Sequence, residues 1–347
     1  MRALRVALLA AIVPVLLTGC GGTNGGRAQP TVTVTVPASS GGTTPASGAS
    51  QAPASRPGIV AVTTAGALVR LDPVAGNVTQ TLVSGGVIGD EISVSPDGST
   101  VYFAQGAGCK AEVESIAIGG GTPAPIAAGD LPAISPDGSK LAIARQPLFS
   151  NSCTAGDLYV AKNFKLVIRT LRSGTEQVLP LPPRIGQSGL FPPISHLSWA
   201  ADSVRLAVSL AAVQDNEGWG LDIVDTSAAK YYLPPGSGVT NVPVSGSPSA
   251  QRSYLREGVF LPDGNLFISR ACCGGVPVRN TSRLMWEVTT SGALVHQVAI
   301  GYPNLDHVSL AASGQWLLYL AGNDLYISQN GNMPVKLTGG LIAAAWV

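Results

Sequence analysis

The pentapeptide SPDGS occurs twice in this chain, at residues 95–99 and again at 135–139. A Pro-Asp-Gly turn between apolar runs is typical of a hairpin, because Pro presets φ, Asp bonds back to the backbone and Gly tolerates a positive φ. The flanking segments align as well, EISVSPDGSTVYFA from Glu91 with LPAISPDGSKLAIA from Leu131. The repeated feature is therefore a whole strand–turn–strand unit.

Three further copies of this unit follow along the chain. They are HLSWAADSVRLAVS from His196, EGVFLPDGNLFIS from Glu257 and HVSLAASGQWLLYL from His307. The copy from Glu257 is one residue shorter after Asp263, and the other two align without gaps. Each copy is followed by two more strand-like runs. Four antiparallel strands in a repeat of roughly 40 to 60 residues are typical of a β-propeller blade.

The two ends of the repeat region complete one further blade. Residues 58–83 supply three strands without an inner strand before them, and the chain ends on the apolar run LIAAAWV, residues 341–347. We predict an all-β fold, a single six-bladed β-propeller in which this last run closes the first blade and removes exposed sheet edges. Seven blades are the alternative, if residues 161–195 or 226–256 contain another one.

The repeated SPDG with LAI and LYV strands resembles the TolB-type β-propeller repeat, over roughly residues 58–347. Propellers of this kind serve as envelope scaffolds, as lids on peptidases, as sugar-acid lyases and as ligand-binding domains. The resemblance therefore implies the fold and leaves the function open. The lyases use channel-mouth histidines on a metal, and this chain has two such histidines without a third.

The N-terminal residues form a targeting region. Arg2 and Arg5 precede the apolar run ALLAAIVPVLL, which is short for a membrane span. The sequence Leu-Thr-Gly-Cys that ends at Cys20 resembles the lipobox of bacterial lipoproteins, in which the cysteine is lipidated; the alternative is an ordinary secretory signal with a chance cysteine. We predict a signal peptide at 1–20, a disordered Thr/Ser/Pro/Gly-rich tether at 21–57 and the propeller at 58–347.

Composition restricts the partners. Charged residues make up 12% of the chain and the net charge is +1, so there is no basic field for nucleic acid. The lipobox-like sequence predicts an exported protein on the outer side of the cytoplasmic membrane, held by its lipid alone. We expect a monomer whose partner is a protein or glycan of the cell envelope.

Polar residues recur where each inner strand begins, six positions before the turn aspartate or its equivalent. They are Glu91, His196, Glu257 and His307, with Leu131 at the same place in the second copy. These positions surround the mouth of the channel on the face opposite the PDG turns. Imidazole and carboxylate suit zinc, manganese or iron, and also proton transfer. All four are binding candidates, and His196 and His307 are candidate metal ligands; alternatively, each residue caps its own strand by hydrogen bonding.

Four cysteines remain after Cys20, and an even number outside the cytoplasm indicates disulfides. Cys109 and Cys153 lie in equivalent loops of neighbouring blades, and we predict that they pair. Cys272 and Cys273 are adjacent, which is compatible with a vicinal disulfide. Cross-pairing among the four, or free thiols, are the alternatives.

The longest loops lie on the same face as these cysteines, and Trp219 is a further binding candidate there. The turn aspartates Asp97, Asp137 and Asp263 are read as structural. The sequence has no Gly-x-Ser-x-Gly elbow, no phosphate loop and no His-Glu-x-x-His motif. We therefore predict a binding scaffold without a required cofactor. The alternative is a metal-dependent lyase or hydrolase that acts on an envelope carbohydrate or peptide.

Overall fold

The computed structural model describes residues 56–107, 110–145, 165–180, 194–210, 220–232, 253–272, 285–290, 294–298, 305–311, 314–329 and 334–347. Contacts divide the chain into two units, Met1–Pro53 and Ala54–Val347, of which the first lies outside the described residues. In the part of the chain that is described, no helix has the length and apolarity that a membrane crossing needs.

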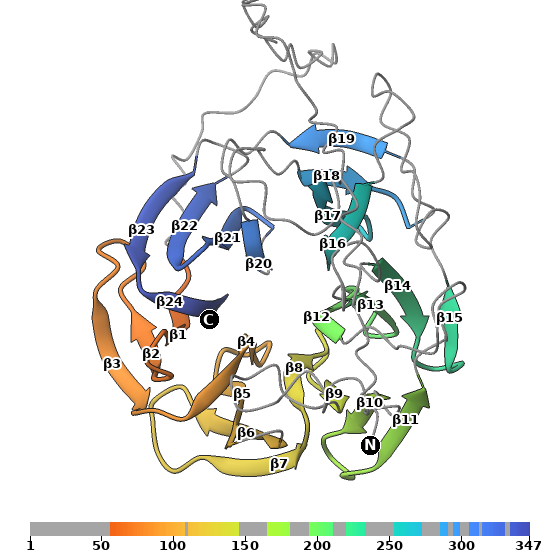
Figure 1. Ribbon diagram of the computed structural model, residues 1–347. Coiled ribbons are helices and arrows are strands. Elements are labelled where there is room, and N and C mark those ends of the chain that lie inside the picture. The colour runs from red at the N-terminus through yellow and green to blue at the C-terminus, as the bar shows by residue number, and fades with distance from the viewer. Residues whose placement is uncertain are drawn as a thin grey trace, which may run out of the picture. The chain divides into compact units, whose positions relative to one another are not determined.

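The described strands form six four-stranded antiparallel sheets, which are the blades of a propeller (Figure 1). From the channel outward, blade 1 contains β24 (Leu341–Trp346), β1 (Ile59–Thr63), β2 (Leu68–Leu71) and β3 (Val78–Val83). Blade 2 contains β4 (Val87–Val94), β5 (Thr100–Ala107), β6 (Lys110–Ala117) and β7 (Ala124–Ala128). Blade 3 contains β8 (Asp130–Ile134), β9 (Lys140–Arg145), β10 (Lys165–Thr170) and β11 (Glu176–Pro180).

The remaining three blades follow in chain order around the ring. Blade 4 contains β12 (Ile194–Trp199), β13 (Arg205–Leu210), β14 (Gly220–Asp225) and β15 (Lys230–Tyr232). Blade 5 contains β16 (Ser253–Phe260), β17 (Leu266–Cys272), β18 (Met285–Val288) and β19 (Leu294–Val298). Blade 6 contains β20 (Leu305–Leu310), β21 (Trp316–Ala321), β22 (Asp324–Gln329) and β23 (Val335–Gly339).

The C-terminal strand closes the ring, as the sequence predicts. β24 pairs with β1 in antiparallel register from Ile59↔Trp346 to Thr63↔Leu341, and the Val347 N–H donates to the Gly58 carbonyl at 2.8 Å. The prediction of six blades is confirmed. Among the described residues, the two segments considered for a seventh blade contribute strands of blades 3, 4 and 5.

The hydrophobic core lies between the blades, because both faces of each sheet are covered by its neighbours. Successive residues of β1 point to opposite sides: Ile59 and Ala61 pack against blade 6, while Val60 and Val62 pack against blade 2. The same alternation holds in β9, where Leu141 and Ile143 face blade 2 and Ala142 and Ala144 face blade 4. A strand buried on both faces needs an unbroken apolar run, which explains sequences such as IVAV and LAIA.

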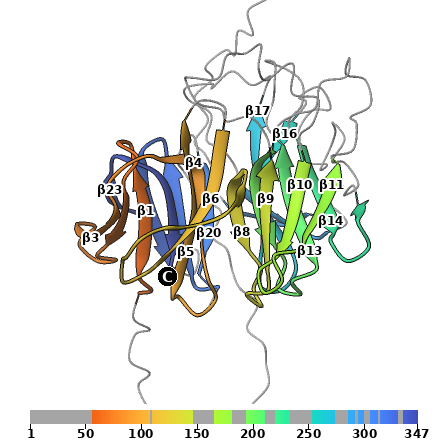
Figure 2. The same cartoon turned by 90° about the horizontal axis from the view of Figure 1, so that it is seen from below.

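The five aligned turns all join the first and second strands of blades 2 to 6, and they share one side of the ring, which we call the turn face (Figure 2). Their glycines have left-handed φ angles: 70° at Gly98, 70° at Gly138, 88° at Gly264 and 69° at Gly314. In blade 4 the equivalent residue is Ser203, with φ of 55°. Its hydroxyl accepts the Asp137 N–H at 3.1 Å, so this non-glycine residue also links two blades.

The other side of the ring, which we call the opposite face, is where second strands end and third strands begin. β9 ends there at Arg145 and β10 begins at Lys165; β17 ends there at Cys272 and β18 begins at Met285. The longer connections in the sequence therefore attach to strands at this face.

The connection from blade 2 to blade 3 contains a glycine that cannot accept a side chain. Gly129 has φ of 135°, and a Cβ placed on it would lie 2.4 Å from Ile143 Cγ2 and 2.7 Å from the Ala144 carbonyl oxygen. Gly121 has nearly the same φ, 134°, but its Cβ would meet no atom within 4 Å.

We therefore expect Gly129→Ala to lower the free energy of unfolding by about 3 kcal/mol or more, because overpacking adds to backbone strain. Gly121→Ala, which carries the strain alone, is expected to cost about 1–2 kcal/mol. Urea unfolding of both variants measures the difference. Equal losses would show that the contact with Ile143 is relieved by a backbone shift.

Candidate functional site

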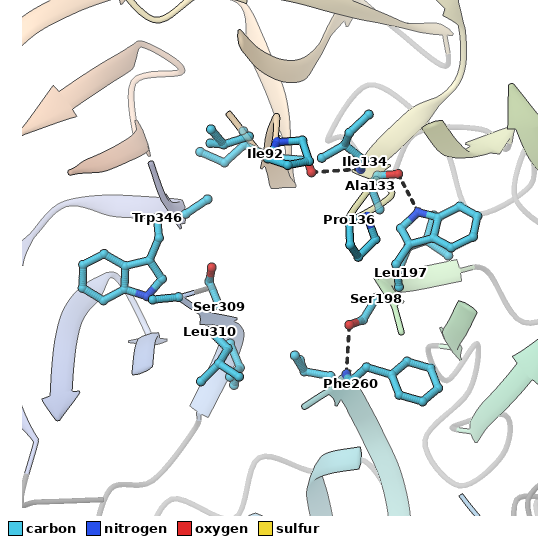
Figure 3. Close-up of a pocket in the computed structure, with 18 of the residues that line it drawn as sticks. Ile92, Ala133, Ile134, Pro136, Leu197, Ser198, Phe260, Ser309, Leu310 and Trp346 are labelled. Atoms are coloured by element: carbon cyan, nitrogen blue, oxygen red, sulfur yellow. Dashed lines mark hydrogen bonds between the residues drawn. The ribbon is translucent and has the colours of Figure 1, made fainter. Parts of the chain in front are cut away.

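The inner strands of the six blades surround a central cavity of about 560 Å³ (Figure 3). Its wall is mostly apolar and includes Ile92, Leu197, Leu310 and Trp346. Between these side chains lie serine hydroxyls. The cavity extends to the prolines of the turn face, such as Pro96 and Pro136. This channel is therefore a concave site that the inner strands of all six blades line.

Two of the residues that the sequence predicts at the channel mouth come together. His196 in β12 and Glu91 in β4 both line the cavity, and His196 Nδ1 lies 3.3 Å from Glu91 Oε1. Both side chains are about nine-tenths buried, with exposed fractions of 8% and 10%. β4 belongs to blade 2 and β12 to blade 4, so this contact spans the inner strand of blade 3.

Blade 3 is irregular where this contact passes. The register of β8 against β9 shifts between Asp130 and Ala133, and Leu131, at the position equivalent to Glu91, has a left-handed φ of 49°. The Asp130 side chain is buried beside it, with 4% exposed. An L-residue in this conformation costs free energy, so the surrounding packing has to hold it there.

The Glu91 carboxylate also has a structural bond. The Leu197 N–H donates to both of its oxygens, at 3.4 Å to Oε1 and 3.3 Å to Oε2. The same carboxylate therefore binds the backbone of β12 and contacts the His196 ring. We interpret this link between blades 2 and 4 as structural and call it the strap. A carboxylate kept for metal binding or proton transfer would be expected to direct an oxygen toward a ligand.

The other two predicted members of this group occupy the expected strands. Glu257 lies in β16 and His307 in β20, both inner strands, but their side chains lie outside the described residues. Among the side chains that are described, no group of three or more His, Cys, Asp or Glu could hold a metal ion. Metal binding by His196 and His307 stays a prediction.

The remaining sequence candidates also fall largely outside the described residues. Cys20, Cys109, Cys153, Cys273 and Trp219 belong to the ranges that are not described, and so does the side chain of Cys272, the last residue of β17. Lipidation, the disulfide pairings and the binding role of Trp219 therefore stay predictions.

The turn aspartates bond within their own turns. Asp97 Oδ1 accepts the Ser95 hydroxyl at 2.5 Å and the Ser99 N–H at 3.0 Å. Asp137 Oδ1 accepts the same pair of groups from Ser135 and Ser139, at 2.6 and 2.9 Å. The repeated serines in SPDGS are thus the donors that hold each carboxylate, as expected for a structural turn.

Serine hydroxyls inside the channel form links that the sequence analysis missed. Ser93 Oγ in blade 2 accepts the Ile134 N–H of blade 3, and Ser198 Oγ in blade 4 accepts the Phe260 N–H of blade 5, both at 3.0 Å (Figure 3). The two serines stand at the same place in the repeat, four residues before the turn aspartate position. A serine at the same position in two copies of the repeat was the signal from which these links could have been predicted.

A six-bladed β-propeller with a strand-closed ring and a narrow, largely apolar channel is the class that these observations define. No family model and no curated protein matches the sequence. Among solved structures, TolB from Acinetobacter baumannii has a TM-score of 0.56 at 15% identity, over 83% of this chain. This chain covers 65% of that protein, so it spans less than two thirds of its length.

Two further structures are similar at a lower level. A putative TolB from Agrobacterium tumefaciens has a TM-score of 0.49 at 13% identity, over 83% of this chain and 92% of that one. The tricorn protease has a TM-score of 0.47 at 14% identity, over 81% of this chain and 30% of that one. Identity at this level shows the fold alone, and the fold is a TolB-like β-propeller.

The turn carboxylates predict a pH dependence at the acid end. The Ser95 hydroxyl, together with the amide and hydroxyl of Ser99, lowers the pKa of Asp97 to about 2. For Asp137, partial burial acts to raise the pKa, but the bonds from Ser135 and Ser139 and the charge of Lys140 outweigh it and bring the pKa to about 2.

Because both pKa values lie below the unfolded value of about 3.9, the two turns stabilise the fold above about pH 4 and lose this contribution as the pH falls toward 2. Carbonyl-detected NMR titration should place both midpoints near 2. Asp97→Asn should remove its share of the acid dependence and leave that of Asp137. Midpoints near 3.9 would contradict the bonding described for these turns.

The strap predicts a large cost for removing one partner. Glu91→Ala should lower the free energy of unfolding by about 3–5 kcal/mol, because it leaves the Leu197 N–H without its acceptor and removes the carboxylate that contacts the buried His196 ring. Lys336→Ala, which breaks the exposed pair with Asp324 at 2.7 Å, is the control and should cost much less. Equal costs would rule out the strap.

The metal content of the purified protein and of His196→Ala tests the alternative, that Glu91 and His196 belong to a metal site. Near-stoichiometric zinc, manganese or iron in the purified protein, lost in His196→Ala, would assign the pair to a metal site and would support the lyase or hydrolase reading.

Proposed function

We propose that the protein is an exported, lipid-anchored binding protein of the cell envelope, whose propeller holds a protein partner at the opposite face. A TolB-like propeller is compatible with a protein-binding scaffold. The lipobox-like sequence that ends at Cys20 supports the export and the anchor. The tether at 21–57 would give the propeller freedom to reach a partner.

The observation that carries the proposal is the difference between the two faces of the ring. On the turn face, the first and second strands of each of blades 2 to 6 are joined by a short turn, and in the turns at Asp97 and Asp137 the polar groups bond within the turn. On the opposite face, the strands attach to the long connections 146–164, 181–193, 211–219, 233–252 and 273–284. Rigid strands that carry long connections are the usual arrangement for a recognition surface.

The channel supports the same assignment. At the end toward the opposite face, Glu91 and His196 contact each other past the inner strand of blade 3, and two of the serine hydroxyls in the wall link neighbouring blades. These polar groups serve the ring itself. The bonded inner strands thus form a rigid scaffold. The connections at the opposite face are the part of the chain that is left for binding.

Site-specific photo-cross-linking in intact cells tests the proposal. Lys110 and Lys165 are exposed at strand starts on the opposite face, whereas Arg172 is exposed in a turn on the turn face. A photo-reactive residue at 110 or 165 should capture a discrete envelope protein, and one at 172 should not. Capture only from 172, or of no protein from any position, would overturn the proposal. A product that disappears after glycosidase treatment would identify a glycan partner.

The anchor is tested separately, so that its failure is distinguishable from failure of the binding face. Cys20→Ser should release the protein from the membrane fraction and abolish labelling by an alkyne fatty acid. Membrane association that survives Cys20→Ser would contradict lipid anchoring while leaving the cross-linking result intact.

A further inference from the structure

Serine recurs in alternate blades at one level of the channel wall. The repeat position four residues before the turn aspartate is Ser93 in blade 2, Ser198 in blade 4 and Ser309 in blade 6. Blades 3 and 5 have Ala133 and Val259 at this position, and the equivalent residue of β24 in blade 1, matched through the bond of the Val347 N–H to Gly58, is Ala345. The ring therefore presents hydroxyls from every second blade, separated by aliphatic side chains.

The third serine departs from the bonding of the other two. Ser93 and Ser198 each accept an N–H from the inner strand of the next blade, at 3.0 Å. In blade 6 the next inner strand is the closing strand β24, and the Ser309 hydroxyl makes no such bond to the residues drawn in Figure 3, where it lies at the edge of the open channel. Because the link between blades does not use it, this hydroxyl is available to a ligand.

The surroundings of Ser309 are apolar. Leu310 and Trp346 line the cavity on the same side (Figure 3). The indole N–H of Trp346 is buried and has no hydrogen-bond partner within the described part of the chain. The Trp346 ring packs against Trp316 in the core between blades 6 and 1, with ring centroids 6.4 Å apart, so this N–H belongs to the core and the cavity beside Ser309 is bounded by apolar surface.

The charge of the wall restricts the ligand. Among the described residues that line the cavity, the ionisable side chains are those of Glu91 and His196, which contact each other at 3.3 Å. A charged ligand would lose its hydration without gaining a counter-ion here, which is costly. A neutral ligand that carries hydroxyl groups on an apolar frame matches a wall of aliphatic side chains and isolated hydroxyls.

We propose that the channel binds a neutral pyranose sugar beside Ser309, Leu310 and Trp346. A pyranose ring has apolar C–H faces for Leu310 and Trp346, and oxygens that accept from the Ser309 hydroxyl. The cavity of about 560 Å³ lies within the range of small-molecule sites and has room for a mono- or disaccharide.

The route of entry separates this site from the proposed protein-binding face. The Glu91–His196 contact joins blades 2 and 4 at the end toward the opposite face, and the lining continues at the other end to Pro96, Pro136 and Pro262 of the turn face. Because Ser309 is the second-last residue of β20, at the end of the strand toward the turn face, we expect the sugar to enter from that face. Sugar binding and protein capture occur at opposite ends of the ring and are testable independently.

Saturation-transfer NMR on the full chain, purified in a detergent without sugar, tests the proposal. The probes are maltose, cellobiose and the methyl glycosides of glucose, galactose and mannose. At least one should receive saturation from the protein. Ser309→Ala should weaken its binding about tenfold, the value of one hydrogen bond, without changing the melting temperature. Ser309→Leu, which fills the channel, should abolish binding.

Two control variants distinguish the ligand role from a structural one. Ser93→Ala removes a link between blades and should lower the melting temperature, whereas the exposed Ser84→Ala should change neither quantity. The proposal is overturned if no probe binds, or if Ser309→Ala and Ser309→Leu bind sugar as the unmodified protein does. Cross-linking yield from Lys110 should be unaffected by Ser309→Leu, so failure of this site leaves the binding face untouched.

Discussion

Burial of both faces of every blade against its two neighbours is the interaction on which the rest of this structure depends. Ile59 and Val60, adjacent in β1, contribute to two different interfaces, and the apolar clusters lie between blades. A single blade therefore has no core of its own, and an open row of blades would leave two apolar faces in water. Closure of the ring by β24 on β1 removes both exposed faces at once, which makes a strand at one end of the chain essential to residues at the other.

The same arrangement leaves the inner edge of each blade facing the channel, and polar side chains meet the backbone groups there. Ser93 and Ser198 accept N–H groups of the following blade, and the indole N–H of Trp199 in blade 4 donates to the Ala133 carbonyl of blade 3 at 2.9 Å. Glu91 does so over a longer span, reaching the Leu197 N–H two blades away. Most polar groups of the channel wall are thus part of the ring's own hydrogen bonding. The Ser309 hydroxyl makes no such bond to the next blade, and it is the group to which we propose that a ligand binds.

The turn face adds a second set of links between blades. Lys140 in blade 3 lies over the Trp199 ring of blade 4, 5.9 Å from its centroid, and Arg205 in blade 4 lies 5.6 Å from the Phe260 centroid of blade 5. The two cations and the two aromatic rings occupy equivalent repeat positions, so one contact is made twice. One side of the ring is therefore stiffened by repeated residues, which leaves the connections of the other side free to differ between blades.

The sequence by itself determined the blade architecture, because turn chemistry and strand alternation are local and recur five times around Asp97 and its equivalents. It also predicted the closing strand, since residues 341–347 had no partner and blade 1 lacked an inner strand. It placed Glu91 and His196 at one level, but equivalence in a repeat does not say which members touch. Only the tertiary structure decided that Glu91 crosses blade 3 to His196, because that contact depends on the irregular start of β8 and the left-handed Leu131. The different bonding of Ser309 was likewise visible only in the structure, because Ser93, Ser198 and Ser309 are equivalent in the repeat.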